Sequence, residues 1–260
     1  MLDRITPLIL TYNEVPNIER TLAQLGWAQR IVVVDSGSTD GTLDLLAKNA
    51  RVSVYVRKFD THAQQWTYGL TETGIDTDWV LALDADYVLN DAFVAEMGRL
   101  APKPATAGFR ARFRYCIAGR PIGSGAYPPV VVLYRRQGAH YVQDGHTQRI
   151  QLQGNLPEFA NRIDHDDRKP LSRWLDSQRN YARQEAEHLT GADTDTLRRV
   201  DRLRSWIWPM PAVMFLYTYV LRGGFMDGWP GLQYSLERTY AELLLSLELL
   251  SRKLNPDRRG

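Results

Sequence analysis

Hydrophobic and polar residues alternate in blocks along the first part of the chain. Short runs of apolar, often β-branched residues are typical of strands that are covered on both faces of a sheet. Such runs lie at 6–11, 30–35, 51–57 and 78–84. Between them, the spacing of apolar positions predicts helices over Val15–Leu25, Thr42–Lys48 and Ala63–Thr73. Strands that alternate with helices in this way predict an α/β fold with a mostly parallel sheet flanked by helices.

The pattern changes after Pro102 and Pro104. Residues 109–115 and 130–136 alternate between apolar and polar positions, which predicts antiparallel strands added to the same sheet. A helix of about twenty residues is predicted to begin at Pro170, because proline is favoured at the start of a helix. A last amphipathic helix is predicted over residues 231–254. We therefore predict a main domain over 1–190, divided into 1–100 and 101–190, and a helical appendage over 191–260.

The segment Trp206–Leu221 is the most apolar part of the chain. It is shorter than the roughly 20 residues that a membrane-spanning helix needs, and it contains two prolines. Arginines flank it on both sides, and tryptophans and tyrosines stand among its aliphatic residues. This composition is typical of a segment that lies in a membrane interface. We predict interfacial contact; the alternative is a pair of core helices that cap the sheet.

Composition narrows the class of protein. The formal net charge is only +2 in 260 residues, which argues against a nucleic-acid-binding protein, although arginines cluster at 198, 199, 202 and 204. Cys116 is the only cysteine, so an intrachain disulfide and a zinc-ligand spacing are both excluded. The N-terminus has Asp3 and a brief apolar run, unlike a cleaved signal peptide. We expect a cytoplasmic protein.

The stretch LALDADYVL places Asp84 and Asp86 one residue apart, where a buried strand is predicted to end. Two carboxylates so close together repel each other unless a proton, a cation or solvent compensates their charge. A hard divalent cation prefers oxygen ligands and usually bridges them to substrate phosphates. The pattern therefore predicts a metal site at both aspartates. The alternative is that one of them caps the following turn.

Polar residues also follow the predicted strands at 6–11 and 30–35. Ligands of such sheets bind beyond the carboxyl ends of the strands, so three polar strand ends at one edge predict a nucleotide site. We expect the base and ribose to be contacted by Thr11, Asn13, Glu14 and Asp35, and the metal-bound diphosphate to lie at Asp84 and Asp86. Helix capping explains Thr39 and Asp40 without any ligand.

Two further residues are candidates for the same site. Arg57 ends the third predicted strand and could contact the nucleotide. Gln65, on the next predicted helix, could line the site. Both are equally compatible with solvated surface positions.

The order LTYNE, VVVDSGSTDGT, AQQWTYGL and WVLALDADYVL resembles the inverting glycosyltransferases of family 2, which have the Rossmann-like GT-A fold. The resemblance covers residues 5–100, and LRGGFMDGWPGL at 221–232 resembles the branch of lipopolysaccharide-core glucosyltransferases. It implies a nucleotide-sugar donor, by default UDP-linked, and Mn²⁺ or Mg²⁺ on the DXD loop, Asp84–Asp86. It also implies that the sugar is transferred with inversion at its anomeric carbon.

Inversion needs one general base to take the proton of the acceptor hydroxyl. Asp144, in YVQDGHTQRI, lies close to where members of this family carry their acidic base; an ordinary turn aspartate is the alternative. Asp166, in IDHDDRK, is the second candidate for the base. His165 is a candidate third metal ligand, as a downstream histidine is in some GT-A enzymes. The alternative for His165 is a structural hydrogen bond, and the alternative for the aspartates is helix capping before Pro170.

The leading hypothesis is a peripheral enzyme on the inner face of the cytoplasmic membrane. It would transfer a sugar from a nucleotide-sugar donor to a glycolipid or lipid-linked saccharide. The arginine cluster and Trp206–Leu221 would hold the enzyme at the membrane by contacting anionic lipids. The glycine-containing loop 121–129 would close over the substrate. One alternative is a metal-dependent nucleotidyltransferase, although the sequence does not show the basic phosphate loop that such enzymes usually have near the N-terminus. The other is a non-catalytic nucleotide-sugar-binding module.

Overall fold

A computed structural model describes residues 1–144, 147–191, 199–204 and 206–255. Its backbone forms two compact units. Unit 1 comprises Met1–Pro121 and Tyr127–Arg168, and unit 2 comprises Ile122–Ala126 and Lys169–Gly260. The chain passes between the units after residues 121, 126 and 168, and unit 2 includes the helix that we predicted to begin at Pro170. The predicted division at residues 190 and 191 stays a prediction.

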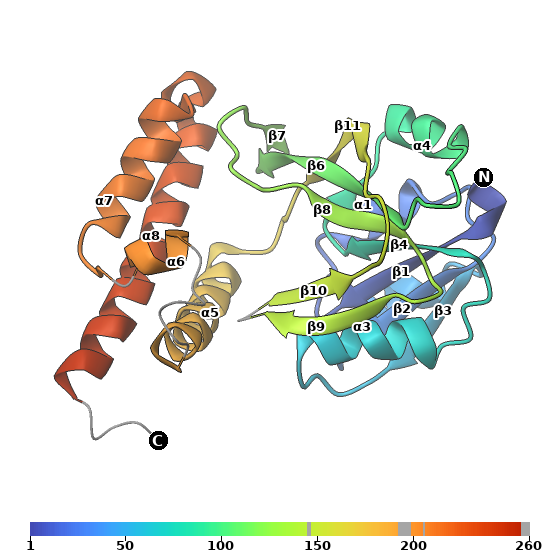
Figure 1. The fold of residues 1–260 in the computed structure, drawn as a ribbon, viewed down its shortest axis with the longest axis horizontal. Coiled ribbons are helices and arrows are strands. Elements are labelled where there is room, and N and C mark those ends of the chain that lie inside the picture. The colour runs from blue at the N-terminus through green and yellow to red at the C-terminus, as the bar shows by residue number, and fades with distance from the viewer. Residues whose placement is uncertain (145–146, 192–198, 205, 256–260) are drawn as a thin grey trace. The chain divides into compact units, whose positions relative to one another are not determined.

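The first strands of unit 1 confirm the predicted parallel sheet (Figure 1). They run parallel in the order β3-β2-β1-β4, and β2 is buried along its whole length. Continuous apolar runs form such strands because helices cover both of their faces. Their bounds are β1 (Ile5–Thr11), β2 (Ile31–Asp35), β3 (Val52–Val56) and β4 (Trp79–Asp84).

Helices cover both faces of this sheet. On one face, Trp66 and Leu70 of α3 pack against a cluster that contains Leu8. On the other face, Leu22 and Phe93, from α1 and α4, belong to the largest core cluster. Figure 1 shows α3 and α4 on opposite sides of the sheet. The short helix η1 (Leu2–Arg4) precedes β1, and the covering helices are α1 (Ile18–Ala23), α2 (Thr42–Ala47), α3 (His62–Thr71) and α4 (Asp91–Gly98).

The sheet continues with strands from the middle of the chain, in the order β4-β8-β6-β11-β5. The predicted antiparallel additions are confirmed, because β8 pairs antiparallel with both β4 and β6. β6 and β11 pair in parallel. A separate antiparallel ribbon of β9 and β10 stacks Tyr141 on Trp66 of α3. The bounds are β5 (Tyr87–Val88), β6 (Gly108–Ile117), β7 (Arg120–Pro121), β8 (Val130–Arg135), β9 (His140–Asp144), β10 (Thr147–Gln151) and β11 (Glu158–His165).

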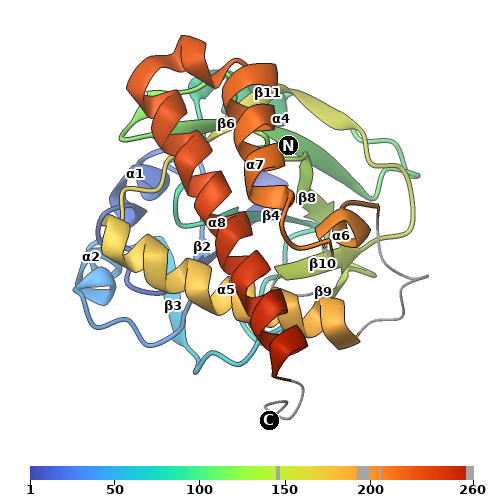
Figure 2. The ribbon, with the colours of Figure 1, turned by 90° about the vertical axis from the view of Figure 1, so that its left-hand side faces the viewer.

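Unit 2 is helical. Figure 2 shows α8 crossing α5, with α7 alongside α8. Arg204 pairs with the buried Glu242 of α8 and with Glu185 of α5. The predicted last helix is confirmed, although it begins at Gly228 rather than at Gly231. The elements are α5 (Leu171–Gly191), α6 (Arg199–Arg204), α7 (Met210–Phe215), the π-helical turn η2 (Leu216–Leu221), the 3₁₀ turn η3 (Gly224–Asp227) and α8 (Gly228–Leu254).

The apolar segment at 206–221 forms α7 and η2, which pack along α8. Among the residues that the structure describes, no helix combines the length and the apolar character that crossing a membrane requires.

Candidate active site

The carboxyl ends of the parallel strands bring the predicted polar residues to one edge of the sheet. In the strand register, Thr11 of β1 is level with Asp35 of β2, and Leu10 is level with Asp84 of β4. Asp35 is in turn level with Val56 of β3, the residue before Arg57. The candidates that the sequence spreads over 1–86 therefore share one edge of unit 1.

Asp35 is fully buried, and its carboxylate organises the loop that follows β2. One oxygen, Oδ1, accepts hydrogen bonds from the backbone N–H groups of Gly37 and Ser38, at 2.9 and 2.7 Å. The other, Oδ2, accepts from the hydroxyls of Thr11 and Ser38, at 2.7 and 2.6 Å. These bonds fix the shape of the loop at the strand edge. Contact of Asp35 with the nucleobase of the donor stays a prediction.

Asn13 links the loops after β1 and β2. Its φ of 56° is in the left-handed region, which asparagine adopts more readily than most residues. Its N–H donates to Ser38 Oγ at 2.7 Å, and its Oδ1 accepts from the N–H of Thr39 at 2.7 Å. The N–H of Glu14 donates to Thr42 Oγ1 at 2.7 Å, at the start of α2. Asn13 and Glu14 therefore hold two strand-end loops together.

Arg57 and Gln65 lie together at the end of β3. Arg57 forms a bidentate ion pair with Asp60, at 2.9 and 2.7 Å, and donates to Gln65 Oε1 at 2.5 Å. Gln65 is fully buried and donates to Ser36 Oγ at 2.9 Å. The hydrogen bond from Arg57 lowers the pKa of Asp60 to about 2. Both candidates thus connect α3 to the loop that Asp35 organises.

The DAD loop meets the end of β11. The short strand β5 follows this loop and pairs antiparallel with β11, so that Tyr87 is level with His165. His165 Nε2 lies 3.2 Å from Asp86 Oδ2. Asp84 is exposed, whereas Asp86 is buried. The structure thus places side by side two of the three predicted metal ligands, which are 79 residues apart in sequence.

The pKa of His165 reflects these neighbours. Burial by itself lowers the pKa of the imidazole, but the charge and hydrogen bond of Asp86 and the charges of Asp84 and Asp167 outweigh burial. The pKa of His165 is therefore raised above its usual value.

The donors at this edge are chemically suited to a divalent cation. They are two carboxylates and an imidazole, the ligand types that Mn²⁺ accepts. No cluster of three His, Cys, Asp or Glu side chains able to hold a metal ion occurs within the described ranges. An ion that is bound largely by substrate phosphates needs only one or two carboxylates from the protein. Asp84 and Asp86 fit that mode of binding.

Aromatic side chains surround His165, which the sequence analysis did not anticipate. Their ring centroids lie 4.8 Å (Tyr115), 5.2 Å (Tyr87), 5.4 Å (Tyr127) and 6.3 Å (Phe113) from the imidazole, all edge-on. Burial, followed by the charges of Asp84, Tyr127 and Asp86, raises the pKa of Tyr87 far above its usual value. This aromatic cage, Tyr87, Phe113, Tyr115 and Tyr127, restricts the orientation of His165. The tyrosine directly after DAD was the one signal for it in the sequence.

The second candidate base, Asp166, lies in an arginine network. Its Oδ2 accepts from Arg20 at 2.5 Å, and its Oδ1 accepts from Arg168 at 2.7 Å. The buried Asn17 donates to Asp167 Oδ1 and accepts from the N–H of Arg168, each at 2.8 Å. The network joins the start of α1 to the residues after His165. Asn17 and Arg20 give no signal along the sequence, because their partners Asp167 and Asp166 lie 150 and 146 residues away.

The first candidate base, Asp144, is the last residue of β9. Its side chain, like residues 145 and 146, lies outside the part of the chain that the structure describes. Its role as a base stays a prediction.

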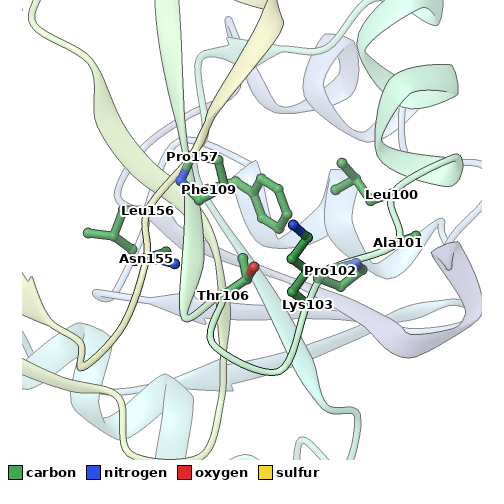
Figure 3. A pocket seen from close by; sticks show the side chains of 9 residues that line it. All are labelled: Leu100, Ala101, Pro102, Lys103, Thr106, Phe109, Asn155, Leu156 and Pro157. Carbon is green, nitrogen blue, oxygen red and sulfur yellow. The ribbon is translucent and has the colours of Figure 1, made fainter.

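A pocket of about 490 Å³ lies at the opposite edge of the sheet (Figure 3). Phe109, near the start of β6, and Pro157, just before β11, line it together with Lys103. Because β4, β6 and β11 run in the same direction, the amino ends of these strands face away from Asp84. This pocket is therefore separate from the candidate active site.

Comparison with solved structures finds the same fold elsewhere. S. aureus TarS 1–349 in complex with UDP-GlcNAc matches with a TM-score of 0.50 and 12% identity, over 96% of this chain and 92% of that chain. The same TarS fragment with UDP matches with a TM-score of 0.45 and 13% identity, over 96% and 91%. A mycobacterial protein matches with a TM-score of 0.44 and 17% identity, over 73% and 76%. Comparison with curated protein sequences finds no match.

The family is established by the sequence itself. The family model described as glycosyl transferase family 2 matches residues 8–149, more than half of the chain. The matched range begins within β1, contains Asp35, Asp84 and Asp86, and ends within β10. The mostly parallel sheet with helices on both faces is the GT-A architecture that the resemblance implied. The chain is therefore a member of glycosyltransferase family 2.

Proposed function

We propose that this enzyme transfers a sugar from a UDP-linked donor to a lipid-linked or lipopolysaccharide-type acceptor. The observation that carries the proposal is the gathering of Thr11, Asp35 and Asp84 at one edge of the sheet, with Asp86 beside His165. Open α/β sheets bind their ligands at this edge. The structure of TarS with UDP-GlcNAc, which shares the fold, supports a nucleotide-sugar donor.

The donor would lie across the strand ends. Its base and ribose would meet the loops that Asp35 and Asn13 organise, close to Arg57. Its diphosphate would reach the DAD loop. The exposed Asp84 and the buried Asp86 would hold a Mn²⁺ or Mg²⁺ ion there. A role for the neighbouring His165 as a third ligand stays a prediction. When bound, this ion neutralises charge on the departing diphosphate.

The transfer itself is a single displacement. The acceptor hydroxyl oxygen forms a bond to the anomeric carbon of the sugar on the face opposite the diphosphate, while the bond from that carbon to the diphosphate oxygen breaks. The configuration at carbon is thereby inverted. A carboxylate takes the hydroxyl proton. We assign this role to Asp144, because both carboxylate oxygens of Asp166 already accept from arginines.

A lipid-linked acceptor would bring the enzyme to a membrane surface. Unit 2 exposes large apolar side chains, which on a protein surface commonly mark an interaction site. The most exposed are Trp229 (83%), Trp208 (82%), Leu221 (78%), Met226 (75%) and Leu254 (70%), followed by Trp206 (67%). In the arginine cluster, Arg204 is held by Glu242 and Glu185. We assign membrane contact, at the inner face of the cytoplasmic membrane, chiefly to the apolar residues.

Calorimetric titration tests the proposed donor and metal. UDP-, GDP-, ADP- and dTDP-sugars are titrated in turn with and without Mn²⁺. We expect UDP-sugars to bind only when Mn²⁺ is present. Asp84→Ala and Asp86→Ala should each abolish this metal-dependent binding and the turnover of the donor, while thermal unfolding shows that the fold is kept. Asp76→Ala, an exposed aspartate in the loop before β4, is the matched control.

Each alternative has its own outcome. Binding without release of UDP, even when acceptors are added, would indicate a non-catalytic module. Metal-independent binding that survives in both aspartate variants would overturn the metal site. Preferential binding of a GDP-, ADP- or dTDP-sugar would change only the proposed nucleotide of the donor and would leave the rest of the proposal intact.

A further inference from the structure

The loop between β7 and β8, Ile122–Ala126, is anchored by side chains of the helical unit to which it belongs. The N–H of Gly123 donates to both carboxylate oxygens of Asp227, at 3.0 and 3.1 Å. The N–H of Ser124 donates to Asp227 Oδ2 at 2.9 Å. Ser124 itself is fully buried. Asp227 therefore binds two successive backbone N–H groups, which is a strong form of hydrogen bonding because the acceptor is charged.

Two other residues hold the rest of this loop. The N–H of Ala126 donates to the hydroxyl oxygen of Tyr234, on α8, at 2.9 Å. The guanidinium of Arg222 donates to the carbonyl oxygen of Gly125 at 2.6 Å. Tyr234 is 2% exposed. The anchor thus combines Asp227, Tyr234 and Arg222, and it engages every residue from Gly123 to Ala126.

The glycines of the segment 221–232 explain how Asp227 reaches this position. Gly223 and Gly228 have φ values of 77° and 65°, in the left-handed region, where other residues are strained. A Cβ at Gly224 would lie 2.8 Å from the carbonyl oxygen of Thr218. One at Gly231 would collide with the carbonyl oxygen of Gly224. The tight packing of η3 between η2 and α8 therefore requires these glycines, and η3 ends at Asp227.

The residue that follows the anchored loop belongs to the candidate active site. Tyr127 comes directly after Ala126 and is part of unit 1. Its ring lies edge-on at 5.4 Å from His165 and at 5.1 Å from Phe113. Its hydroxyl lies 3.4 Å from that of Tyr87. A displacement of Ala126 would therefore move a member of the aromatic cage around His165.

We propose that Asp227 is a positioning residue for the glycosyl transfer: with Tyr234 and Arg222 it fixes Ile122–Ala126, and so holds Tyr127 against His165. The inference rests on the proposed function, because it assumes that His165 and the DAD loop act on the donor. It assigns to the motif GGFMDGW a role in the active site, although Asp227 is 62 residues beyond His165 in sequence.

Amide hydrogen exchange and donor hydrolysis together test this role. The full chain is compared with Asp227→Ala, Asp227→Asn and Tyr234→Phe. Asp176→Asn and Tyr240→Phe, which change an exposed carboxylate and a second tyrosine hydroxyl within unit 2, are the controls. The substrates are UDP-glucose, UDP-galactose and UDP-N-acetylglucosamine with Mn²⁺, and the readouts are release of UDP and protection of the amides at 123–126.

We expect faster exchange at 123 and 124 in Asp227→Ala, and at 126 in Tyr234→Phe. For Asp227→Ala, kcat should fall by roughly 10²-fold, the effect of a small displacement at a reacting centre, with KM for the donor unchanged. Asp227→Asn, which keeps one accepting oxygen, should be intermediate. A purely structural role would instead lower the melting temperature and the active fraction, without a graded loss of kcat.

Two results would overturn the inference. Unchanged exchange in Asp227→Ala would show that the anchor is absent in solution. Faster exchange with wild-type kcat would show that the loop does not position the active site. If wild-type protein releases no UDP from any donor, the proposed function fails instead, and exchange still decides whether the anchor exists. Should Asp227→Ala not fold, Tyr234→Phe gives the same readouts.

Discussion

Asp84 and Asp86 are tolerated one residue apart because their surroundings differ. Solvent reaches Asp84, whereas the imidazole of His165 lies 3.2 Å from the buried Asp86. The raised pKa of His165 means that it keeps its proton to a higher pH than a free histidine does. A cation, water or a protonated histidine can therefore each offset part of the charge. The two aspartates need not carry the same role in binding a metal.

The two candidate bases are predicted to respond differently to substitution. Asp144→Asn should lower kcat by roughly 10²–10⁴-fold, because it removes the proton acceptor, with donor binding and stability kept. Asp166→Asn should instead lower the free energy of unfolding by about 2 kcal/mol, because it weakens charged hydrogen bonds to Arg20 and Arg168. Steady-state kinetics and urea unfolding of both variants measure the contrast.

Asp76→Asn, a change at an exposed position, serves as the control for both measurements. A loss of kcat at Asp166 but not at Asp144, with stability unchanged, would transfer the role of base to Asp166.

At the scale of elements, the strands that are covered on both faces were predictable. Continuous apolar runs at 30–35 and 78–84 became β2 and β4 within one residue of their expected starts. The strand β5 was not predictable. It has only two residues, and it exists because β11 pairs with it. The hydrophobic pattern along the chain shows local periodicity. It does not show that Tyr87 will pair with His165, 78 residues further on.

The candidate site divides in the same way. The strand-end residues Thr11, Asp35 and Asp84 could be placed at one edge because parallel strands have their carboxyl ends together. The contacts of Asn17 with Asp167, and of Tyr127 with His165, could not be placed. These contacts depend on how distant segments pack. A single asparagine or tyrosine in a loop forms no sequence pattern that would indicate its partner.

The close packing of α3 on the sheet gives a prediction about stability. A Cβ at Gly69 would lie 2.7 Å from Leu8 Cδ1 and 3.2 Å from Val34 Cγ2. Gly69→Ala gains helix propensity, but overpacking a buried contact costs about 1–3 kcal/mol. We expect a net loss of about 1 kcal/mol in the free energy of unfolding, measured in urea, because the gain in propensity is smaller.

Thr71→Ala, at an exposed position of the same helix, is the matched control for this change. If Gly69→Ala were as stable as wild type or more so, Leu8 would have room to rotate away from the helix.

At the scale of the whole molecule, the exposed apolar side chains of unit 2 predict binding to lipid. Trp208→Ser combined with Trp229→Ser should reduce flotation with phosphatidylglycerol-containing vesicles by at least about tenfold. Each of these exposed side chains would contribute over about 1 kcal/mol to the free energy of membrane binding when it inserts into the lipid. Phe59→Ser, an exposed aromatic of unit 1, is the control and should leave flotation unchanged. Equal flotation of all three proteins would remove these tryptophans from the membrane contact.

The anchored loop also determines how such enzymes can exchange parts. The chain passes between the units after residues 121, 126 and 168. A gene fusion that replaced only the residues after 168 would leave Gly123–Ala126 facing a foreign helix, without the carboxylate of Asp227 or the hydroxyl of Tyr234. A working chimera therefore requires the loop to be inherited together with the helices. Exchange of the helical unit together with this loop would need two crossovers within the sheet unit, after residues 121 and 126, in addition to the one before α5.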